Sequence, residues 1–116
     1  MTDIAVPVFG DVVRVSFPYA GKDGHKERPA VVINSPVYQQ QRADVLVLAL
    51  SSRLTPQKAL GEAVLLDWEK AGLTKPSRFK AVVATVMQNR LLGIMGRLSE
   101  RDIRQLRLLL SMIIGA

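Results

Sequence analysis

The sequence predicts a mainly β fold, in which a small, strongly bent sheet or barrel is completed by a C-terminal helix. Two observations lead to this fold class. Six short segments have the residue types of strands and are separated by turn-forming residues, and the end of the chain has the apolar spacing of an amphipathic helix. The length of 116 residues fits one domain that spans residues 1–116.

The first two expected strands flank a polar loop. Residues 11–17 alternate between apolar and polar types, with Arg14 and Ser16 on the polar face. Residues 18–24 collect proline, glycine and aspartate, and we expect them to form a long loop. The run 30–33 is rich in β-branched residues and is expected to end before the Asn-Ser-Pro that follows it.

Four more strands are expected in the middle of the chain. The run 45–50 is apolar throughout, which predicts a strand that is buried on both faces. Residues 62–66, 79–87 and 91–95 carry enough Val, Leu and Thr for three further strands. Between the first two of these, residues 67–72 are expected to form a helical turn that ends at its glycine.

The last element is an amphipathic helix. Ser99 has the residue type of an N-cap, and Asp102 stands at the third helical position, where an acid can satisfy free amide groups. The apolar residues that recur at helical spacing after this cap are Ile103, Leu106, Leu110 and Ile113.

The composition excludes several classes of protein. The chain has no cysteine, which excludes disulfides, thiolate ligands and a cysteine nucleophile. His25 is the only histidine and no acidic cluster surrounds it, so we expect no metal and no other cofactor. No apolar run approaches the ~20 residues that span a bilayer. We therefore expect a cytoplasmic protein that is not attached to a membrane.

The chain is basic. Sixteen Lys and Arg against ten Asp and Glu give a net charge of +6, which favours a phosphate backbone, an acidic membrane or an acidic protein as partner. Arg28 is the most interesting cation because it stands where the polar loop meets a strand, and a guanidinium there can bind a phosphate with two hydrogen bonds. The competing interpretation is an ion pair of Arg28 with Glu27 or Asp11.

A series of short motifs runs along nearly the whole chain. They are Gly10-Asp11-Val12-Val13 with Phe17, Arg28-Pro29-Ala30-Val31-Val32-Ile33, Ser35-Pro36 with Tyr38, residues 45–53 ending in Ser51-Ser52-Arg53, Gly72-Leu73 with Lys75-Pro76-Ser77, and Gly96-Arg97-Leu98-Ser99 with Asp102. In this order and spacing the sequence resembles the MazF/PemK family of toxin endoribonucleases. The resemblance implies an SH3-like barrel, a homodimer, metal-independent cleavage of single-stranded RNA such as mRNA, and an acidic antitoxin that covers the RNA groove.

The resemblance also implies site residues. Arg28 matches the family's arginine before proline, which is regarded as catalytic, and Ser51 falls on a catalytic hydroxyl position where the family usually has threonine. Serine keeps the hydroxyl but lacks the methyl group that restricts its rotamers. Ser52 and Arg53 belong to the same motif and are further candidates for RNA contact.

Two departures from the family leave the proton acceptor open. Where the family has an Arg-x-Asp-Gln stretch, this chain has Lys80-Ala81-Val82-Val83, so Lys80 keeps a cation but Val82 cannot accept a proton. The loop before Arg28 also lacks the family's Glu-Gln pair. Cleavage by the 2′-hydroxyl of RNA needs a base, and His25 or Glu27 is the candidate for this role.

Two other functions are weighed against the endoribonuclease. One is a catalytically degenerate protein of the same fold that binds RNA or the antitoxin, which the residues Ser51 and Val82 suggest. The other is a gyrase poison of the CcdB type, which shares the barrel. CcdB toxins resemble one another in a C-terminal Trp-Gly-Ile, whereas this chain ends Met-Ile-Ile-Gly-Ala, so this alternative is the weakest.

Overall fold

The computed structural model describes residues 6–18, 25–54 and 62–115 of the chain. These residues form six strands, two α-helices and a short 3-10 helix, η1. In chain order the elements are β1 (Asp11–Pro18), β2 (His25–Val32), α1 (Pro36–Gln41), β3 (Asp44–Ser51), β4 (Ala63–Val64), β5 (Arg78–Met87), η1 (Gln88–Arg90), β6 (Leu91–Arg97) and α2 (Glu100–Ile113).

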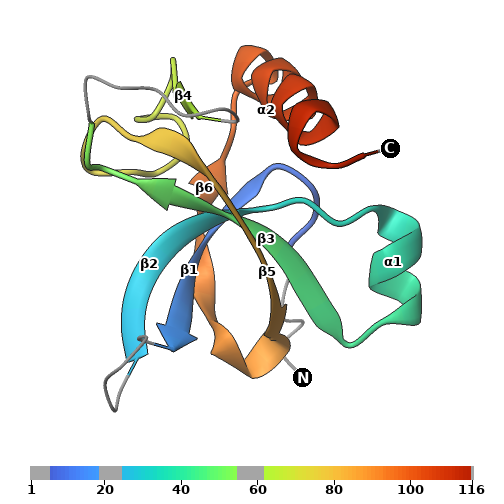
Figure 1. Ribbon diagram of the computed structural model, residues 1–116. Coiled ribbons are helices and arrows are strands. Elements are labelled where there is room, and N and C mark those ends of the chain that lie inside the picture. Colours follow the sequence, from blue (N-terminus) through green and yellow to red (C-terminus); the bar gives the residue numbers. More distant parts are fainter. Residues whose placement is uncertain (1–5, 19–24, 55–61, 116) are drawn as a thin grey trace.

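The strands form one antiparallel sheet that curls strongly. Its strand order is β4-β5-β3-β2-β1-β6. Figure 1 shows the curled sheet, with α2 across its upper end and α1 beside the start of β3. The expected bent sheet with a C-terminal helix is confirmed. None of the described helices is long and apolar enough to cross a membrane.

The core consists of two clusters on the two faces of the central strands. One cluster lies between the sheet and α2 and includes Leu106 and Leu109 of the helix. The other lies inside the curl of β1, β2, β3 and β5 and consists almost entirely of valines. Alternate residues of β3 enter the two clusters, for example Val47 one and Leu48 the other. This explains why the whole run is apolar, as the sequence predicted.

The second strand is longer than expected and contains a proline. β2 begins at His25, and Pro29 lies within it, opposite Arg14 of β1. The pairing of β2 with β3 begins only at Ala30. The missing N–H of Pro29 therefore costs no hydrogen bond on that side, which is how a proline is tolerated in this strand.

Three further segments remain to be compared with the sequence: one is shorter than expected, one contains a helix that was not predicted, and one lies mostly outside the described residues. β4 comprises only Ala63–Val64 instead of residues 62–66. The loop after β2 contains the short helix α1, in which the Ser35 side chain accepts a hydrogen bond from the Tyr38 backbone N–H. Ser-Pro is a good helix start, but a single turn has too little apolar periodicity to be predicted. The loop expected over residues 18–24 lies outside the described residues apart from Pro18, which ends β1.

The start of α2 is fixed by two side chains with different roles. Ser99 is the predicted N-cap, and its Oγ accepts a hydrogen bond from the Asp102 N–H. Asp102 itself does not cap the helix. Its buried carboxylate accepts hydrogen bonds from the backbone N–H groups of Leu66 and Asp67, both at 2.8 Å. The acid therefore ties the helix to the segment after β4.

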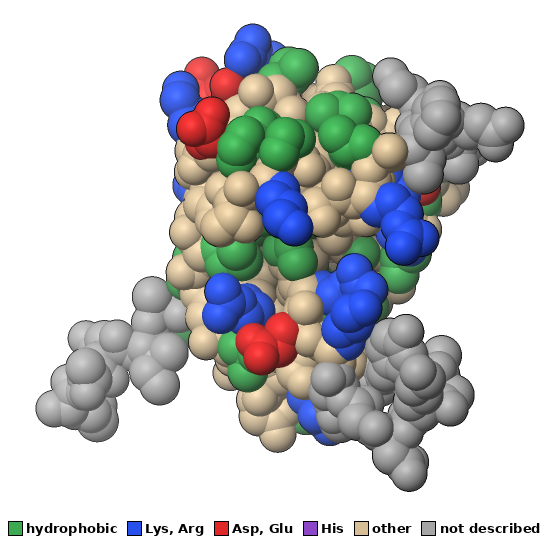
Figure 2. All heavy atoms as spheres, turned by 90° about the vertical axis from the view of Figure 1, so that its left-hand side faces the viewer, with side chains coloured by type: hydrophobic (Ala, Val, Ile, Leu, Met, Phe, Trp, Pro, Cys, Tyr) green, Lys and Arg blue, Asp and Glu red, His purple; other side chains and the backbone are tan. Residues whose placement is uncertain are grey.

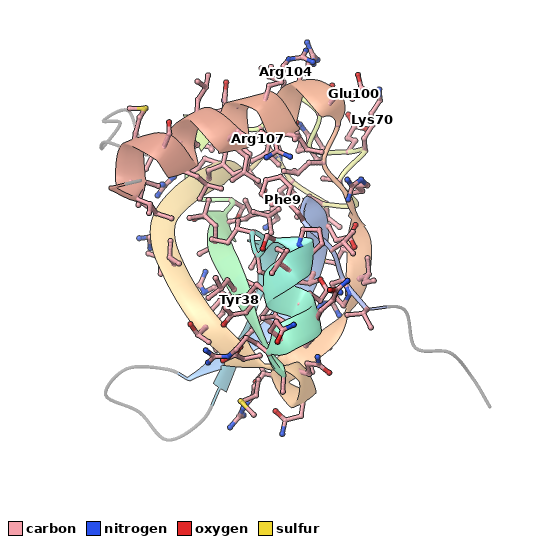
Figure 3. The ribbon with its side chains drawn as sticks, turned by 90° about the vertical axis from the view of Figure 1, so that its right-hand side faces the viewer. Phe9, Tyr38, Lys70, Glu100, Arg104 and Arg107 are labelled. Atoms are coloured by element: carbon pink, nitrogen blue, oxygen red, sulfur yellow. The ribbon has the colours of Figure 1, made fainter. Side chains whose placement is uncertain are left out.

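A second contact holds the middle of α2. Figure 3 shows Arg107 pointing from the helix toward Phe9, which precedes β1. The guanidinium carbon lies 4.4 Å from the centre of the Phe9 ring, within the range of a cation–π interaction. The helix is thus held over the end of the curled sheet.

Candidate active site

A cavity of about 290 Å³ opens at one end of the sheet. Its walls come from β1, β2, the end of β3, the segment 73–77 before β5, and β6. The lining residues are Arg14, Glu27, Arg28, Pro29, Leu50, Ser51, Ser52, Leu73, Thr74, Lys75, Ser77 and Met95. Apolar side chains are thus surrounded by cations, hydroxyl groups and a single carboxylate.

Arg28 lines this cavity from β2, where it is exposed and stands opposite Val15 of β1. The sequence left open an ion pair with Glu27 or Asp11, and neither forms. Asp11 pairs with Arg97 at 3.1 Å, and Glu27 lies nearest to Arg14. Among the residues that the structure describes, Arg28 has no ion pair and no side-chain hydrogen bond. Its guanidinium is therefore available to an anionic ligand.

Ser51 is the last residue of β3 and lines the same cavity. Its Oγ accepts a hydrogen bond of 3.1 Å from the backbone N–H of Arg53. A serine hydroxyl has one hydrogen to donate besides its acceptor lone pairs. With an acceptor site of Ser51 occupied by Arg53, the hydroxyl hydrogen remains for an oxygen atom in the cavity. Ser52 also contributes to the wall.

Glu27 is the only carboxylate among the residues that line the cavity. Its Oε1 lies 3.9 Å from a guanidinium nitrogen of Arg14, and both side chains are more than half exposed. Exposed pairs at this distance contribute little to stability. The carboxylate of Glu27 is therefore open to a ligand, and Arg14 adds a second guanidinium beside it.

Two lining cations were not predicted as site residues. Arg14 was expected on the polar face of the first strand, and Lys75 belongs to one of the quoted motifs, but neither was assigned to the site. Arg14 reaches the cavity because β1 pairs with β2, which sets Arg14 opposite Pro29. Lys75 reaches it because segment 73–77 returns to the end of β3. The alternation in residues 11–17 was the available signal for Arg14.

Two predicted candidates, Lys80 and Arg53, lie outside the cavity. Lys80 is exposed on β5 and does not line the cavity, and Val82, whose lack of a carboxylate raised doubt about catalysis, is likewise outside it. The register between β3 and β5 shifts between Leu48 and Leu50, so the stretch that contains both residues bulges from the sheet. Arg53 follows the cavity wall but is not part of it. His25 is the first residue of β2, and its side chain lies outside the described part of the chain.

One wall of the cavity depends on two glycines. Gly72 has a φ of +81°, and a Cβ there would lie 2.1 Å from the carbonyl oxygen of Met95. At Gly96 a Cβ would lie 2.6 Å from the backbone of Ala71. The two backbones therefore touch, which no other residue type allows. The turn that ends at Gly72, as predicted, thereby sets Leu73 and the residues after it against β6.

The composition of this cavity suits a phosphodiester. Guanidinium, ammonium and hydroxyl groups bind and neutralise phosphate oxygens, and the apolar floor suits the carbon atoms of a sugar or base. A divalent metal requires several oxygen or nitrogen ligands, but this cavity offers one carboxylate. Within the described residues no group of three Asp, Glu or His side chains is placed to hold a metal ion.

Basic side chains extend beyond the cavity. Figure 2 shows the side of the molecule that lies on the left in Figure 1, where β2 and the end of β3 are found. Lys and Arg side chains are spread over this face, with hydrophobic side chains between them and acidic ones at fewer places. Such a distribution favours an extended anion over a single small one.

A second depression, at the start of α2, has a different character. Its volume is about 490 Å³, and two of its charged residues, Asp67 and Arg101, are paired with each other. Both carboxylate oxygens of Asp67 accept hydrogen bonds from the guanidinium of Arg101, and Ser99 donates another. These bonds hold the pKa of Asp67 well below its usual range. The Asp67 carboxylate thus makes a structural contact with the start of α2. The first cavity remains the candidate site because it brings together Arg28, Ser51 and Glu27.

Comparison with known proteins gives one family. Residues 9–114 match the family described as PemK-like, MazF-like toxin of type II toxin-antitoxin system. No curated protein matches the sequence significantly.

The fold is similar to that of several solved structures. MazF from Deinococcus radiodurans superposes with a TM-score of 0.74 at 21% identity, covering 97% of this chain and 100% of that one. An endoribonuclease in complex with its cognate antitoxin, from a mycobacterial species, gives 0.73 at 16% identity and coverage of 95% and 96%. The Mycobacterium tuberculosis toxin MazF-mt6 gives 0.70 at 16% identity, with 89% and 94% covered. At these identities the similarity concerns the fold.

Proposed function

Because the chain belongs to the PemK-like, MazF-like toxin family of type II toxin–antitoxin systems, we propose that it is an endoribonuclease toxin that cleaves single-stranded RNA, including mRNA, without a metal ion. The family match confirms the resemblance that the motifs indicated. The proposed active site is the cavity lined by Arg28, Ser51 and Glu27.

One observation carries this proposal. A guanidinium with no partner among the described residues, a hydroxyl with a hydrogen to donate and a single carboxylate line the same small cavity. Cleavage of RNA by its own 2′-hydroxyl needs these three kinds of group: a cation at the phosphate, a donor to its oxygens and a base.

The proposed reaction starts at the carboxylate. Glu27 takes the proton of the 2′-hydroxyl, and the 2′-oxygen forms a bond to phosphorus while the bond to the 5′-oxygen breaks. Arg28 and the Ser51 hydroxyl stabilise the negative charge that builds up on the phosphate oxygens. Lys75, on a different wall from Glu27, donates a proton to the leaving 5′-oxygen. The products are a 2′,3′-cyclic phosphate and a 5′-hydroxyl.

The proposal does not require a carboxylate at position 82. A degenerate, non-cleaving protein was considered because Val82 stands where the family has an aspartate. Val82 lies outside the cavity and Glu27 lies within it, so in this proposal Glu27 takes the role of the proton acceptor. No feature of the cavity supports the gyrase-poison alternative.

The proposal includes the toxin's partners and location. An acidic antitoxin would neutralise it by covering the basic face, and a solved complex of a structurally similar endoribonuclease contains its cognate antitoxin. We place the protein in the cytoplasm, where mRNA is available, and regard residues 1–116 as one toxin domain that acts as a homodimer.

Incubation of the purified protein with a long unstructured RNA tests the function. We expect cleavage at short sequences that persists in EDTA, because no metal takes part, and products that carry 2′,3′-cyclic phosphate ends. A substrate with a deoxyribose at the cleaved position should resist, since its attacking hydroxyl is missing. Cleavage that requires Mg²⁺, or normal cleavage of the deoxyribose substrate, would contradict the mechanism, and intact RNA after prolonged incubation would contradict the activity.

A further inference from the structure

Arg78 begins β5 directly opposite Ser51 in the ladder between β3 and β5. Its side chain is only 12% exposed. The other described arginines that form ion pairs, for example Arg14 and Arg101, are all more than half exposed. A long cationic side chain loses much rotamer freedom when it is buried, so its contacts must compensate for that cost.

Those contacts hold the segment that follows Ser51. The Nε of Arg78 donates a hydrogen bond of 2.7 Å to the backbone carbonyl oxygen of Arg53. Its Nη1 lies 2.8 Å from Oε2 of Glu62, whose side chain is also largely buried. The N–H groups of Nη1 do not point at an acceptor, so this contact is an ion pair and not a hydrogen bond. The pair keeps the guanidinium in place.

The held segment in turn holds the hydroxyl of Ser51. The backbone N–H of Arg53 donates to Ser51 Oγ at 3.1 Å. The carbonyl group of Arg53 is therefore held by Arg78, and the backbone N–H of Arg53 in turn holds the Ser51 hydroxyl. Serine has no methyl group to restrict its χ1 angle, so this amide is the described contact that selects its rotamer.

We propose that Arg78 is a positioning residue for the reaction proposed above, on which this inference rests: by holding the carbonyl of Arg53, it orients the Ser51 hydroxyl toward the phosphate. Arg78 does not line the cavity, so we expect it to make no direct contact with RNA bound there. Its loss should therefore reduce the rate of the chemical step and leave RNA binding in place. A small misplacement of a catalytic group is enough for a large loss of rate.

Arg78→Met tests this, because methionine keeps an unbranched chain but removes the hydrogen bond and the charge. We expect kcat to fall about 10- to 100-fold and KM to stay close to that of a matched control. The control is Arg104→Met, which removes the same charge from α2 near its exposed start, where Figure 3 labels the residue. Equal kcat values for the two variants would overturn the proposal.

A rescue experiment separates positioning from general stability. Threonine at position 51 carries the methyl group that restricts χ1. When Ser51→Thr is combined with Arg78→Met, the double variant should recover most of the kcat that Arg78→Met alone loses. The threonine would not repair a fold weakened by the lost ion pair. Failure of the threonine to recover any rate would show that Arg78 does not act through Ser51.

Amide hydrogen exchange of Arg53 gives a readout that is independent of RNA cleavage. If the wild-type protein cleaves no RNA, the proposed function fails, but Arg78→Met should still speed exchange at the Arg53 amide relative to Arg104→Met. Unchanged protection of that amide would overturn the positioning role itself. If Arg78→Met melts below the assay temperature, Arg78→Lys replaces it, because one ammonium cannot occupy both guanidinium positions. A lysine variant with wild-type kcat and protection would also overturn the proposal.

Discussion

Arg28 is the residue whose environment points most directly to chemistry. It is exposed at the cavity and has no partner within the described chain, so its removal breaks no ion pair. We expect Arg28→Ala to fold with an unchanged melting temperature and to lose activity. The loss of charge stabilisation in a transition state typically costs ~3 kcal/mol, about a hundredfold or more in rate.

Arg28→Lys serves as the graded control for this prediction. It keeps the positive charge but loses the planar, two-pronged geometry of the guanidinium, so it should recover only part of the rate. Melting temperature and cleavage rate should be measured on the same preparation. A folded alanine variant with wild-type cleavage would remove Arg28 from the catalytic residues.

Individual residues of the candidate site were predictable where a motif, or the chemistry that RNA cleavage requires, marked them. Arg28, Ser51 and Ser52 stand in motifs that the sequence indicated, Glu27 was a candidate because cleavage needs a base, and the cavity brings all four together. Lys80 stands in such a motif too, but a shift in strand register places it elsewhere. Register depends on pairing between distant segments, which a single sequence does not display.

At the scale of elements, strong periodicity made prediction reliable. The long runs of β1, β3, β5 and α2 were expected within two residues of their observed bounds. The apolar patterns of β1, β3 and α2 reflect their buried faces, whereas β5 is mostly exposed and was marked by its Val and Thr content. β4 and α1 are short, and their extent is decided by neighbours instead of by their own sequence. The role of the Asp102 carboxylate is likewise decided by tertiary contacts, since it accepts hydrogen bonds from the segment after β4 and not from its own helix.

The contact between this segment and α2 predicts how stability depends on pH. The pKa of Asp67 is lowered, chiefly by the hydrogen bonds from Arg101 and Ser99. A carboxylate with a lowered folded pKa stabilises the protein above its unfolded pKa, which is about 3.9, and this contribution is lost as pH falls through the folded value. At pH values below about 4 we therefore expect a lower melting temperature, in part because Asp67 becomes protonated.

Asp67→Asn isolates this contribution. The variant should melt at a lower temperature than wild type at neutral pH, and the difference should narrow as the pH falls below the usual range of an aspartate. Glu100→Gln is the matched control, because it removes an exposed acid from the same end of α2, and its difference from wild type should be smaller at neutral pH. A constant difference between Asp67→Asn and wild type from pH 7 to pH 3 would contradict the assignment.

At the scale of the whole molecule, several large apolar side chains are exposed on the described surface. Leu108 and Met112 of α2 are more than half exposed, one turn apart on the helix, and Ile114 follows just beyond its end. Val82 and Val83 of β5 are exposed as well. Contiguous apolar surface on a protein in water commonly marks an interface.

This surface predicts a homodimer, and light scattering at micromolar concentration should give twice the mass of one chain. Because burial of Leu108 and Met112 would stabilise the interface, Leu108→Glu combined with Met112→Glu should shift the mass toward one chain by placing two charges in an apolar contact. Val37→Glu provides the control, since Val37 is 68% exposed on α1 and belongs to neither of these two surfaces; it should leave the mass unchanged. A wild-type protein with the mass of one chain would refute the dimer, and a double variant that remains a dimer would place its interface away from this face of α2.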